Sequence, residues 1–239
     1  MNKLIMTSVT AALLGSAAMA QDVIRLGTEG AYPPYNFIND AGEVDGFERA
    51  LGDELCLRAE LNCTWVVTDW DSIIPNLVSG NYDAIIAGMS ITDERKEVID
   101  FTDPYTQPDP SAFLALGEVD LENAVIAAQT GTIQASYVTS MEGATLLEFA
   151  TPDETISAVR NGEADAVLAD KAFLEPIDSE GGELSFIGED ILIGGGIGLG
   201  VRQSDTELRD TFSAAIQSMK DDGTLNELIT EWLPGSATF

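Results

Sequence analysis

The stretch WDSIIPNLVSGNYDAIIAG, residues 70–88, decides the fold, because PDETISAVRNGEADAVLAD, residues 152–170, repeats its pattern. Each stretch begins with apolar residues at helical spacing, passes a helix-ending glycine, Gly80 or Gly162, and continues into an apolar strand. The apolar helix positions are Ile74, Leu77 and Val78 in the first copy and Ile156 and Val159 in the second. Apolar strands that alternate with helices are typical of parallel α/β sheets covered on both faces. Two copies in one chain predict two similar α/β lobes.

Capping signals mark three helix starts. Residues 151–154 read Thr-Pro-Asp-Glu, the pattern of a capping box, at the start of the second copy. The same pattern of a hydroxyl residue and a glutamate three positions later occurs at residues 204–207 and 224–227, and predicts two C-terminal helices, each opened by such a box. A strand is expected just before them, at residues 197–201.

The amino-acid composition excludes several classes of function. The chain has 239 residues, of which 45% are hydrophobic, and 41 acidic against 11 basic side chains give a formal net charge of −30. This acidity excludes a nucleic-acid partner, since little could neutralise a run of phosphates. The sequence has no histidine, which excludes a Ser-His-Asp triad and a histidine-based zinc site. We expect no cofactor and no metal.

The N-terminal segment resembles an export signal. Lys3 is followed by a mainly apolar segment, residues 4–14, and then by Ala18-Met19-Ala20, a cleavage pattern that precedes Gln21. The alternative, an uncleaved membrane anchor, is weakened because the apolar run is shorter than the ~20 residues that a span needs. We therefore expect a signal peptide at residues 1–20 and an exported mature protein.

An oxidising compartment allows a disulfide. Cys56 and Cys63 are the only cysteines, and we expect them to pair. A redox-active pair would more usually have the spacing C-x-x-C.

The ends of the strands locate the expected ligand site. In open α/β sheets, ligands bind beyond the carboxyl ends of the strands. Gly88, Met89 and Ser90 follow the first repeated strand, and Asp170 ends the second. A cleft between the two lobes would bring both sets of residues to one small molecule.

The residue types at these strand ends fit a dipolar ligand. Arg95 carries a planar guanidinium suited to a carboxylate, and Ser90 can donate or accept a hydrogen bond. Gly131 and Thr132 follow another expected strand, where a helix N-terminus would offer free N–H groups to an anion. Asp170 is an acceptor for an ammonium group. Each residue alone has a plainer interpretation as a surface ion pair, a cap or a turn, but together they predict a receptor for a free amino acid.

Motifs along nearly the whole mature chain carry a family resemblance. They are EGAYPPY at 29–35, DGF at 45–47, the cysteine pair, DWD at 69–71, DAI at 83–85, MSIT at 89–92 with Arg95, FT at 101–102 with PY at 104–105, GT at 131–132, ADA at 164–166 with Asp170, and DGT at 222–224. This set resembles the periplasmic amino-acid-binding proteins of ABC importers, family 3 of the bacterial extracellular solute-binding proteins, and in particular the lysine/arginine/ornithine, arginine and histidine group.

The resemblance implies a fold and a function. The expected fold is the type II periplasmic binding protein fold, with a discontinuous first lobe (21–108 and 195–239), a second lobe (109–194), and hinge segments near 107–111 and 191–196. The expected function is to capture a free polar amino acid, in particular a basic one, and deliver it to the membrane permease of an ABC importer. The resemblance implies a monomeric receptor that makes or breaks no bond.

The resemblance also implies roles for single residues at the backbone end of the ligand. Arg95 would hold the ligand carboxylate with help from Ser90 and the backbone of Thr132. Asp170 would hold the α-ammonium, together with polar groups around Gly88 and Ser90.

Three further residues would contact the side chain of the ligand. Tyr32 and Trp70 would sandwich it, and Glu29 would meet a distal ammonium or guanidinium; the alternative for Glu29 is a solvated loop carboxylate. Two departures from relatives, Ala87-Gly88 and Ile133, remove side-chain hydrogen-bond partners and leave the choice of amino acid, or of an imine conjugate, open.

Two other functions fit the same scaffold. The first is a periplasmic dehydratase similar to cyclohexadienyl dehydratase, in which Glu29 would protonate a leaving hydroxyl. The second is a sensor module that acts through a separate membrane partner. The acidic surface fits either salt adaptation or the steering of a cationic ligand.

Overall fold

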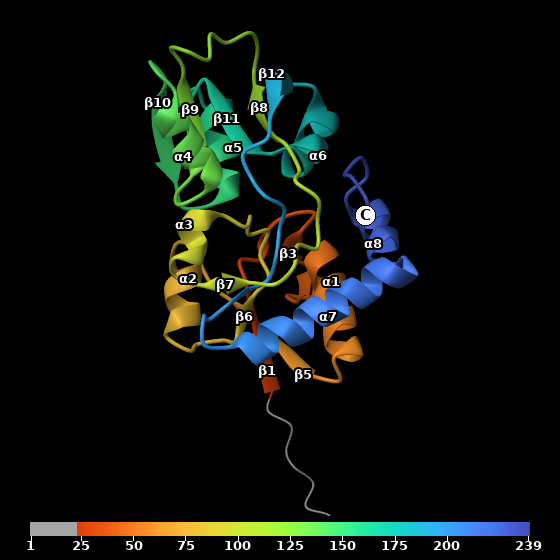
Figure 1. Ribbon diagram of the computed structural model, residues 1–239. Coiled ribbons are helices and arrows are strands. Elements are labelled where there is room, and N and C mark those ends of the chain that lie inside the picture. Colours follow the sequence, from red (N-terminus) through yellow and green to blue (C-terminus); the bar gives the residue numbers. More distant parts are fainter. Residues whose placement is uncertain (1–22) are drawn as a thin grey trace, which may run out of the picture.

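Two α/β lobes form the molecule (Figure 1). The computed structural model describes residues 23–239, except for the side chains of residues 179–181. The expected signal peptide, residues 1–20, lies outside the described residues. Within residues 23–239, no helix is both long and apolar enough to cross a membrane.

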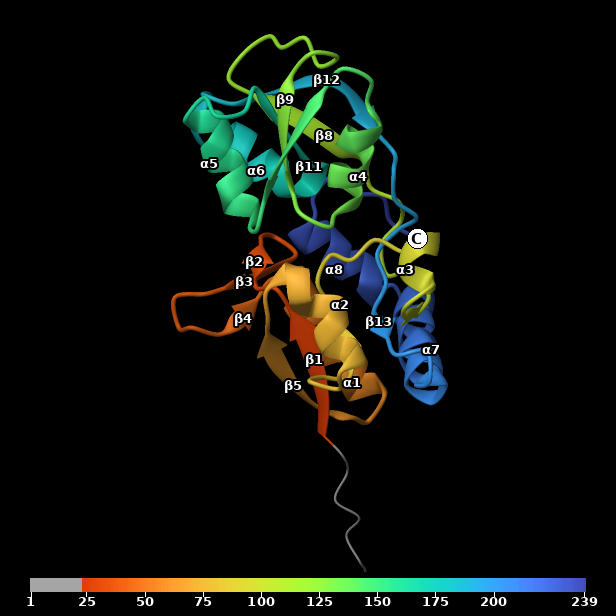
Figure 2. The same ribbon diagram turned by 90° about the vertical axis from the view of Figure 1, so that its left-hand side faces the viewer.

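The sheet of the first lobe combines strands from both ends of the described chain. Its order is β5-β1-β6-β13-β7, and β1 pairs in parallel with β5 and β6, whereas β13 runs antiparallel to its neighbours. The strands are β1 (Val23–Thr28), β5 (Asn62–Val67), β6 (Ala84–Ile85), β7 (Asp100–Phe101) and β13 (Gly200–Val201). A small antiparallel sheet projects from this lobe (Figure 2) and contains β2 (Ala31–Tyr32), β3 (Asn36–Ile38) and β4 (Val44–Asp45).

The sheet of the second lobe is continuous in sequence and has the order β10-β9-β11-β8-β12. Its strands are β8 (Ser111–Ala115), β9 (Val125–Gln129), β10 (Thr145–Phe149), β11 (Ala166–Asp170) and β12 (Ser185–Ile191). β9 pairs in parallel with β10 and β11, and β8 runs antiparallel to both β11 and β12. The predicted α/β class with two lobes is confirmed, but both sheets are mixed rather than purely parallel.

Helices cover both faces of each sheet. In the first lobe, α1 (Phe47–Arg58), α7 (Thr206–Asp222) and α8 (Thr224–Trp232) pack on one face, and α2 (Trp70–Val78) packs on the other. In the second lobe, α5 (Pro152–Arg160) and α6 (Lys171–Gly181) face α4 (Ile133–Ser140) across the sheet. Both faces of the sheet need cover because successive side chains of an extended segment point to opposite sides. Along residues 84–87, Ala84 and Ile86 enter one core, whereas Ile85 and Ala87 enter the other.

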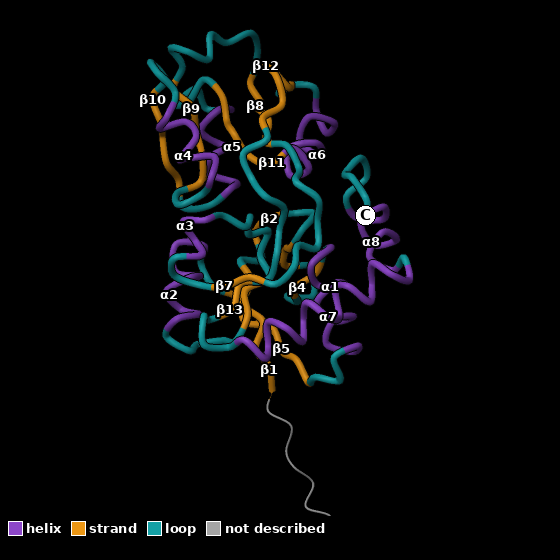
Figure 3. Tube along the Cα trace, in the orientation of Figure 1, coloured by secondary structure: helices purple, strands orange, loops and turns teal. Residues whose placement is uncertain are grey.

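Two segments connect the lobes (Figure 3), residues 102–110 and 192–199. They lie side by side where they leave the first lobe, because the Tyr105 amide donates to Ile197 O at 2.8 Å and the Ile197 amide donates to Thr106 Oγ1 at 3.1 Å. Gly196 has φ +88°, and a Cβ there would lie 2.7 Å from Thr106 O. The limits given above for each lobe stay a prediction.

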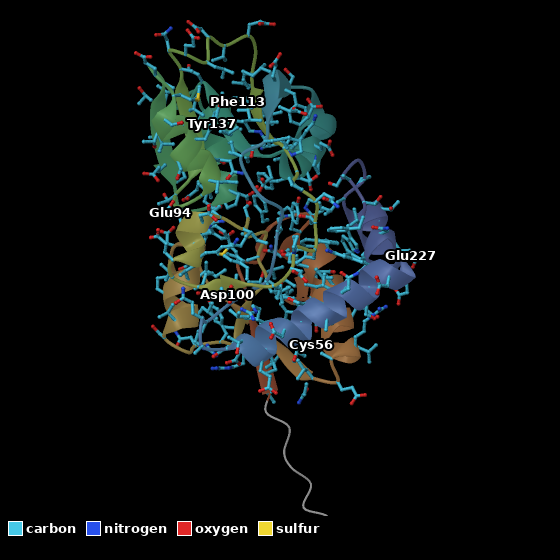
Figure 4. The ribbon with its side chains drawn as sticks, viewed as in Figure 1. Cys56, Glu94, Asp100, Phe113, Tyr137 and Glu227 are labelled. Carbon is cyan, nitrogen blue, oxygen red and sulfur yellow. A yellow bond between two sulfur atoms is a disulfide. The ribbon has the colours of Figure 1, made fainter. Side chains whose placement is uncertain are left out.

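The cysteines form the expected disulfide, Cys56–Cys63, which joins the end of α1 to β5. Figure 4 labels Cys56 in the first lobe, far from the boundary between the lobes. The disulfide therefore stabilises the scaffold and takes no part in the site.

Some local predictions are wrong. The capping box at Thr151 is present, but the two C-terminal helices form without theirs: Asp205 precedes α7 and pairs with Arg202 at 2.6 Å, and the Thr224 hydroxyl donates to Asp222 instead of capping α8. The strand predicted for 197–201 is limited to β13, with a single bridge between Ile197 and Ser90. Val78 is 53% exposed, because α2 buries Ile73 and Leu77, four positions apart, against the sheet, and Val78 lies off that face.

Candidate functional site

A cavity lies between the two lobes and has an empty volume of about 340 Å³, including its mouth. Clefts between domains are a preferred place for small-molecule sites. The residues that line it come from both lobes: Glu29, Tyr32, Trp70, Ala87, Gly88, Ser90, Arg95, Gln129, Thr132, Ile133, Gln134 and Asp170. Eight of the ten predicted site residues are among them.

Arg95 enters the cavity from α3 (Asp93–Lys96), a short helix capped by the side chain of Thr92. Its Nη1 donates to Ser90 O at 2.8 Å, and its Nη2 donates across the lobe boundary to Gly131 O at 3.3 Å. Burial lowers the pKa of Arg95 to about 10, while the carboxylates of Asp170 and Glu94 act in the opposite direction. The guanidinium is therefore charged at neutral pH and oriented by two carbonyl groups.

Asp170 ends β11 and faces the cavity from the second lobe. Its Oδ2 accepts the Tyr32 hydroxyl at 2.8 Å, and its Oδ1 accepts Gln134 Nε2 at 2.9 Å. Burial raises the pKa of Asp170 to about 6; the negative charge of Asp109 adds to this, and the Tyr32 hydrogen bond and the charge of Arg95 oppose it. A carboxylate whose ionisation is costly gains most when an ammonium group binds beside it.

Glu29 follows β1 and is only 8% exposed. Its Oε1 accepts Gln129 Nε2 at 2.7 Å, so this hydrogen bond also joins the two lobes. Burial raises the pKa of Glu29 to about 7; the Gln129 hydrogen bond lowers it, and the charges of Asp69, Asp71 and Asp153 raise it further. The alternative of a solvated loop carboxylate is wrong, because Glu29 is buried against the cavity.

The two predicted aromatic residues differ in their surroundings. The Tyr32 ring stacks on Phe173 of the second lobe, with ring centroids 4.5 Å apart, and also neighbours Tyr35 at 5.8 Å. Trp70 begins α2, and the Arg95 guanidinium carbon lies 5.4 Å from the centroid of its ring. Tyr32 therefore already has aromatic neighbours within the protein. The sandwich of a ligand between Tyr32 and Trp70 stays a prediction.

Thr132 caps α4 at the cavity. Its hydroxyl accepts the Ala135 amide and donates to Gln129 O at 2.7 Å. The first amides of α4 have no partner within the helix and carry its positive dipole end, which favours an anion at this point. Ile133, at the first helical position, places an apolar side chain on the cavity wall.

Two predicted residues do not line this cavity. Met89 is fully buried in the core between α2 and the sheet, because alternate residues of an extended segment point to opposite sides. Gly131 is exposed and contributes through its carbonyl, which accepts Arg95. It also borders a wider opening between the lobes, whose wall includes Glu94 and Tyr137, labelled in Figure 4 on α3 and α4.

Two polar lining residues were not in the predicted set, Gln129 and Gln134. Gln129 donates to Glu29, and Gln134 donates to both Asp170 and Ser111. Gln129 lies at a strand end, so the strand-end rule used for Asp170 could have found it. Gln134 lies one helical position beyond Ile133 and gave no comparable signal.

The cavity thus holds a guanidinium near a helix N-terminus, a buried carboxylate from the other lobe, and a second buried carboxyl group. This set can bind the carboxylate and the ammonium of one zwitterion. Among the residues that the structure describes, no group of three or more cysteine, aspartate and glutamate side chains is arranged to hold a metal ion.

Comparisons with known proteins agree with the two-lobed α/β fold. Residues 24–235 match the family described as bacterial extracellular solute-binding proteins, family 3. The arginine-binding periplasmic protein of Mannheimia haemolytica is 31% identical over 224 residues, which cover 91% of this chain and 93% of the relative.

Two solved structures are informative. A periplasmic His/Glu/Gln/Arg/opine family-binding protein from Silicibacter pomeroyi, in complex with lysine, is 65% identical with a TM-score of 0.88, and the match covers 90% of this chain and all of the other. An ancestral amino-acid-binding protein, described as a precursor of cyclohexadienyl dehydratase, is 27% identical with a TM-score of 0.77, over 88% of this chain and 95% of the other.

Proposed function

Because the chain belongs to family 3 of the bacterial extracellular solute-binding proteins, we propose that it is a periplasmic receptor that captures a free basic amino acid and delivers it to the permease of an ABC importer. The observation that carries the proposal is the meeting of Arg95 from the first lobe and Asp170 from the second in one cavity. A ligand that bridges the two charges would hold the lobes together around itself.

The binding mode follows from the donors and acceptors. The ligand carboxylate would lie at the Arg95 guanidinium and the first amides of α4, beside Thr132. The α-ammonium would lie at Asp170. Both contacts are charge-assisted and shielded from water, so each contributes more than an exposed ion pair of about 0 to 1 kcal/mol.

Glu29 supports a basic rather than a neutral ligand. A buried carboxyl group with a pKa near 7 becomes a stable carboxylate when a cation binds beside it. Trp70 forms a wall of the same cavity and already lies close to the Arg95 guanidinium, and an aromatic wall also favours a cationic or flat ligand side chain. The lysine complex of the Silicibacter pomeroyi protein agrees with this choice.

The proposal also covers the compartment, the oligomeric state and the closing motion of the receptor. We infer export by a signal peptide cleaved before Gln21, action as a monomer, and closure through the connecting segments near 107–111 and 191–196. The periplasmic names of the relatives support the compartment. No covalent step is part of this function.

A dehydratase is the second candidate, because one structural neighbour is described as a precursor of such an enzyme and Glu29 has the pKa of a general acid. The enzyme would release phenylpyruvate from prephenate, or phenylalanine from arogenate, with loss of carbon dioxide and water in each case. The similarity to binding proteins over nearly the whole chain favours the receptor.

Titration calorimetry of the mature protein against a panel of amino acids tests the proposal. Arginine, lysine and ornithine should bind, and glutamate should not. A ligand at 100 times its Kd should also add about 2.7 kcal/mol of stability in a thermal-shift assay. Phenylpyruvate release without amino-acid binding would establish the enzyme instead.

A further inference from the structure

We propose that Glu48 is a positioning residue for ligand binding: a buried series of hydrogen bonds, Gly30–Asn36–Glu48–Gly88, fixes the two first-lobe loops that carry Glu29 and Gly88. Tyr105 ties the same carboxylate to the segment that leads to the second lobe. This inference rests on the proposed receptor function and adds a residue that touches no ligand.

The hydrogen bonds form a continuous series. Glu48 Oε1 accepts the Gly88 amide at 2.6 Å and also the Tyr105 hydroxyl, while Oε2 accepts Asn36 Nδ2 at 2.7 Å. Asn36 Oδ1 in turn accepts the Gly30 amide at 2.8 Å. The side chains of Glu48, Asn36 and Tyr105 are 0% exposed, so water does not replace any of these bonds.

The direction of each bond is determined by Glu48. Its carboxyl group receives three neutral donors; burial raises the pKa of Glu48, and each of these three hydrogen bonds acts in the opposite direction. Asn36 uses both halves of its amide, since its NH₂ group meets Glu48 and its oxygen meets Gly30. If position 48 did not accept, the Asn36 amide would gain by rotating, and the Gly30 amide would lose its acceptor.

Of the two amides held by this series, one belongs to a residue that lines the cavity and the other to the residue after one. Gly30 directly follows Glu29, and Gly88 lines the cavity below the Tyr32 ring. Both glycines have positive φ, +71° and +61°, and glycine backbone has many accessible conformations. Anchored amides therefore decide where the Glu29 carboxyl group and the Gly88 carbonyl point.

The third donor extends the series to the lobe connection. Tyr105 lies in the first connecting segment, and its amide donates to Ile197 in the second. Glu48 thus contacts the pocket loops and, through Tyr105, the place where both segments leave the first lobe. A shift in either part is transmitted to the other through one carboxylate.

A donor–acceptor exchange tests the series in the mature full-length protein. Glu48→Gln keeps an oxygen for Gly88 and Tyr105 but turns an NH₂ group toward the NH₂ of Asn36. Asn36→Asp keeps an acceptor for Gly30 but turns a carboxylate toward the Glu48 carboxylate. In the double variant the two positions exchange roles: the new amide at position 48 donates to the new carboxylate at position 36, and that carboxylate still accepts the Gly30 amide. The net charge of the double variant is that of the wild type.

We expect each single variant to bind L-lysine about 5- to 100-fold more weakly, the range for a broken buried polar contact, and the double variant to recover to within about threefold of the wild type. The ratio of lysine to glutamine affinity separates this role from a merely structural one: a structural role would leave the ratio unchanged, and the proposal predicts that it falls in Glu48→Gln. Single variants with wild-type affinity, or a folded double variant as weak as the singles, would overturn the proposal.

A milder pair of variants keeps the test decisive if the single variants fold poorly. Tyr105→Phe removes one donor from Glu48 and should weaken lysine binding several-fold. Tyr82→Phe removes an equally buried hydroxyl, which donates to Ile73 O on the other face of the same sheet, and should leave the affinity unchanged. Equal affinities for these two variants would contradict the link to the connecting segment. A wild-type protein that binds no amino acid would instead refute the receptor function.

Discussion

Ligand binding should depend on pH differently for cationic and neutral amino acids, because Glu29 has a raised pKa of about 7. A guanidinium beside Glu29 favours its ionised form, so binding of arginine should release a proton below pH 7 and strengthen as pH rises. Citrulline has the same length as arginine but a neutral ureido group, and it should not draw on the charge of Glu29. The two ligands therefore isolate the contribution of this carboxyl group.

The magnitude follows from the pKa. A carboxyl group with a pKa of about 7 is ~1% ionised at pH 5 and ~90% ionised at pH 8, so arginine should lose about 90-fold in affinity through Glu29 between these pH values. Asp170, with a pKa of about 6, adds a loss of about tenfold that every amino acid shares. The ratio of arginine to citrulline affinity should thus fall by about 90-fold from pH 8 to pH 5.

The assay is titration calorimetry with both ligands at pH 5, 6, 7 and 8, in paired buffers of different ionisation enthalpy so that released protons are counted. Glu29→Gln is the control, and it should bind arginine with the shallower pH dependence of citrulline. Parallel pH curves for the two ligands in the wild type, or a steep arginine curve that persists in Glu29→Gln, would refute the role of Glu29.

The same pKa determines stability without a ligand. The folded protein holds the Glu29 proton more tightly than the unfolded chain, so the free energy of unfolding should fall as pH rises from about 4.5 to about 7, by up to about 3 kcal/mol. Glu29→Gln should remove this loss and be more stable than the wild type at pH 8, while binding arginine less well. Urea denaturation of both proteins at pH 5 and pH 8 measures the two differences in stability.

Three further changes test other parts of the account. Arg95→Ala should weaken every amino acid by about 2 to 5 kcal/mol, measured by calorimetry, because it leaves the ligand carboxylate without its cation; a loss confined to basic ligands would reassign its role. Replacing Cys56 and Cys63 by serine should lower the free energy of unfolding by about 2 to 3 kcal/mol without changing affinity, since the disulfide closes a short loop far from the site. Gly196→Ala should destabilise the protein more than Gly80→Ala, because both glycines have positive φ but only Gly196 has a backbone oxygen within 2.7 Å of the new Cβ; equal melting temperatures would contradict this.

The fold could be predicted because its signals are local. The repeated helix, glycine and strand pattern at 70–88 and 152–170 corresponds to α2 with β6 and α5 with β11, each beside a central parallel strand. The pattern could not predict that β13 and β8 run antiparallel to their neighbours, because their direction depends on how the chain returns between the lobes. The cap expected at residue 224 failed for a similar reason, since Arg58, which is distant in sequence, binds Thr224 and Asp222. At residue 204 the competing contacts are local, because Ser204 donates to Asp205 and Asp205 pairs with Arg202.

The site could be predicted as far as strand ends determine it. Ser90 and Asp170 follow directly from that rule, and the structure brings them to one cavity with Arg95. Met89 was misplaced because the rule does not say which face of an extended segment meets the ligand. Gln134 and Glu48 act through side-chain hydrogen bonds to residues far away in sequence, and such contacts leave no periodic signal.

A crystal structure of the protein grown with L-lysine at pH 8 tests the central claim most directly. The account predicts lysine in the cavity between the lobes, with its carboxylate at Arg95, its α-ammonium at Asp170 and its Nζ at Glu29, each at about 3 Å. Lysine bound with its α-ammonium at Glu29, or with its carboxylate away from Arg95, would contradict it.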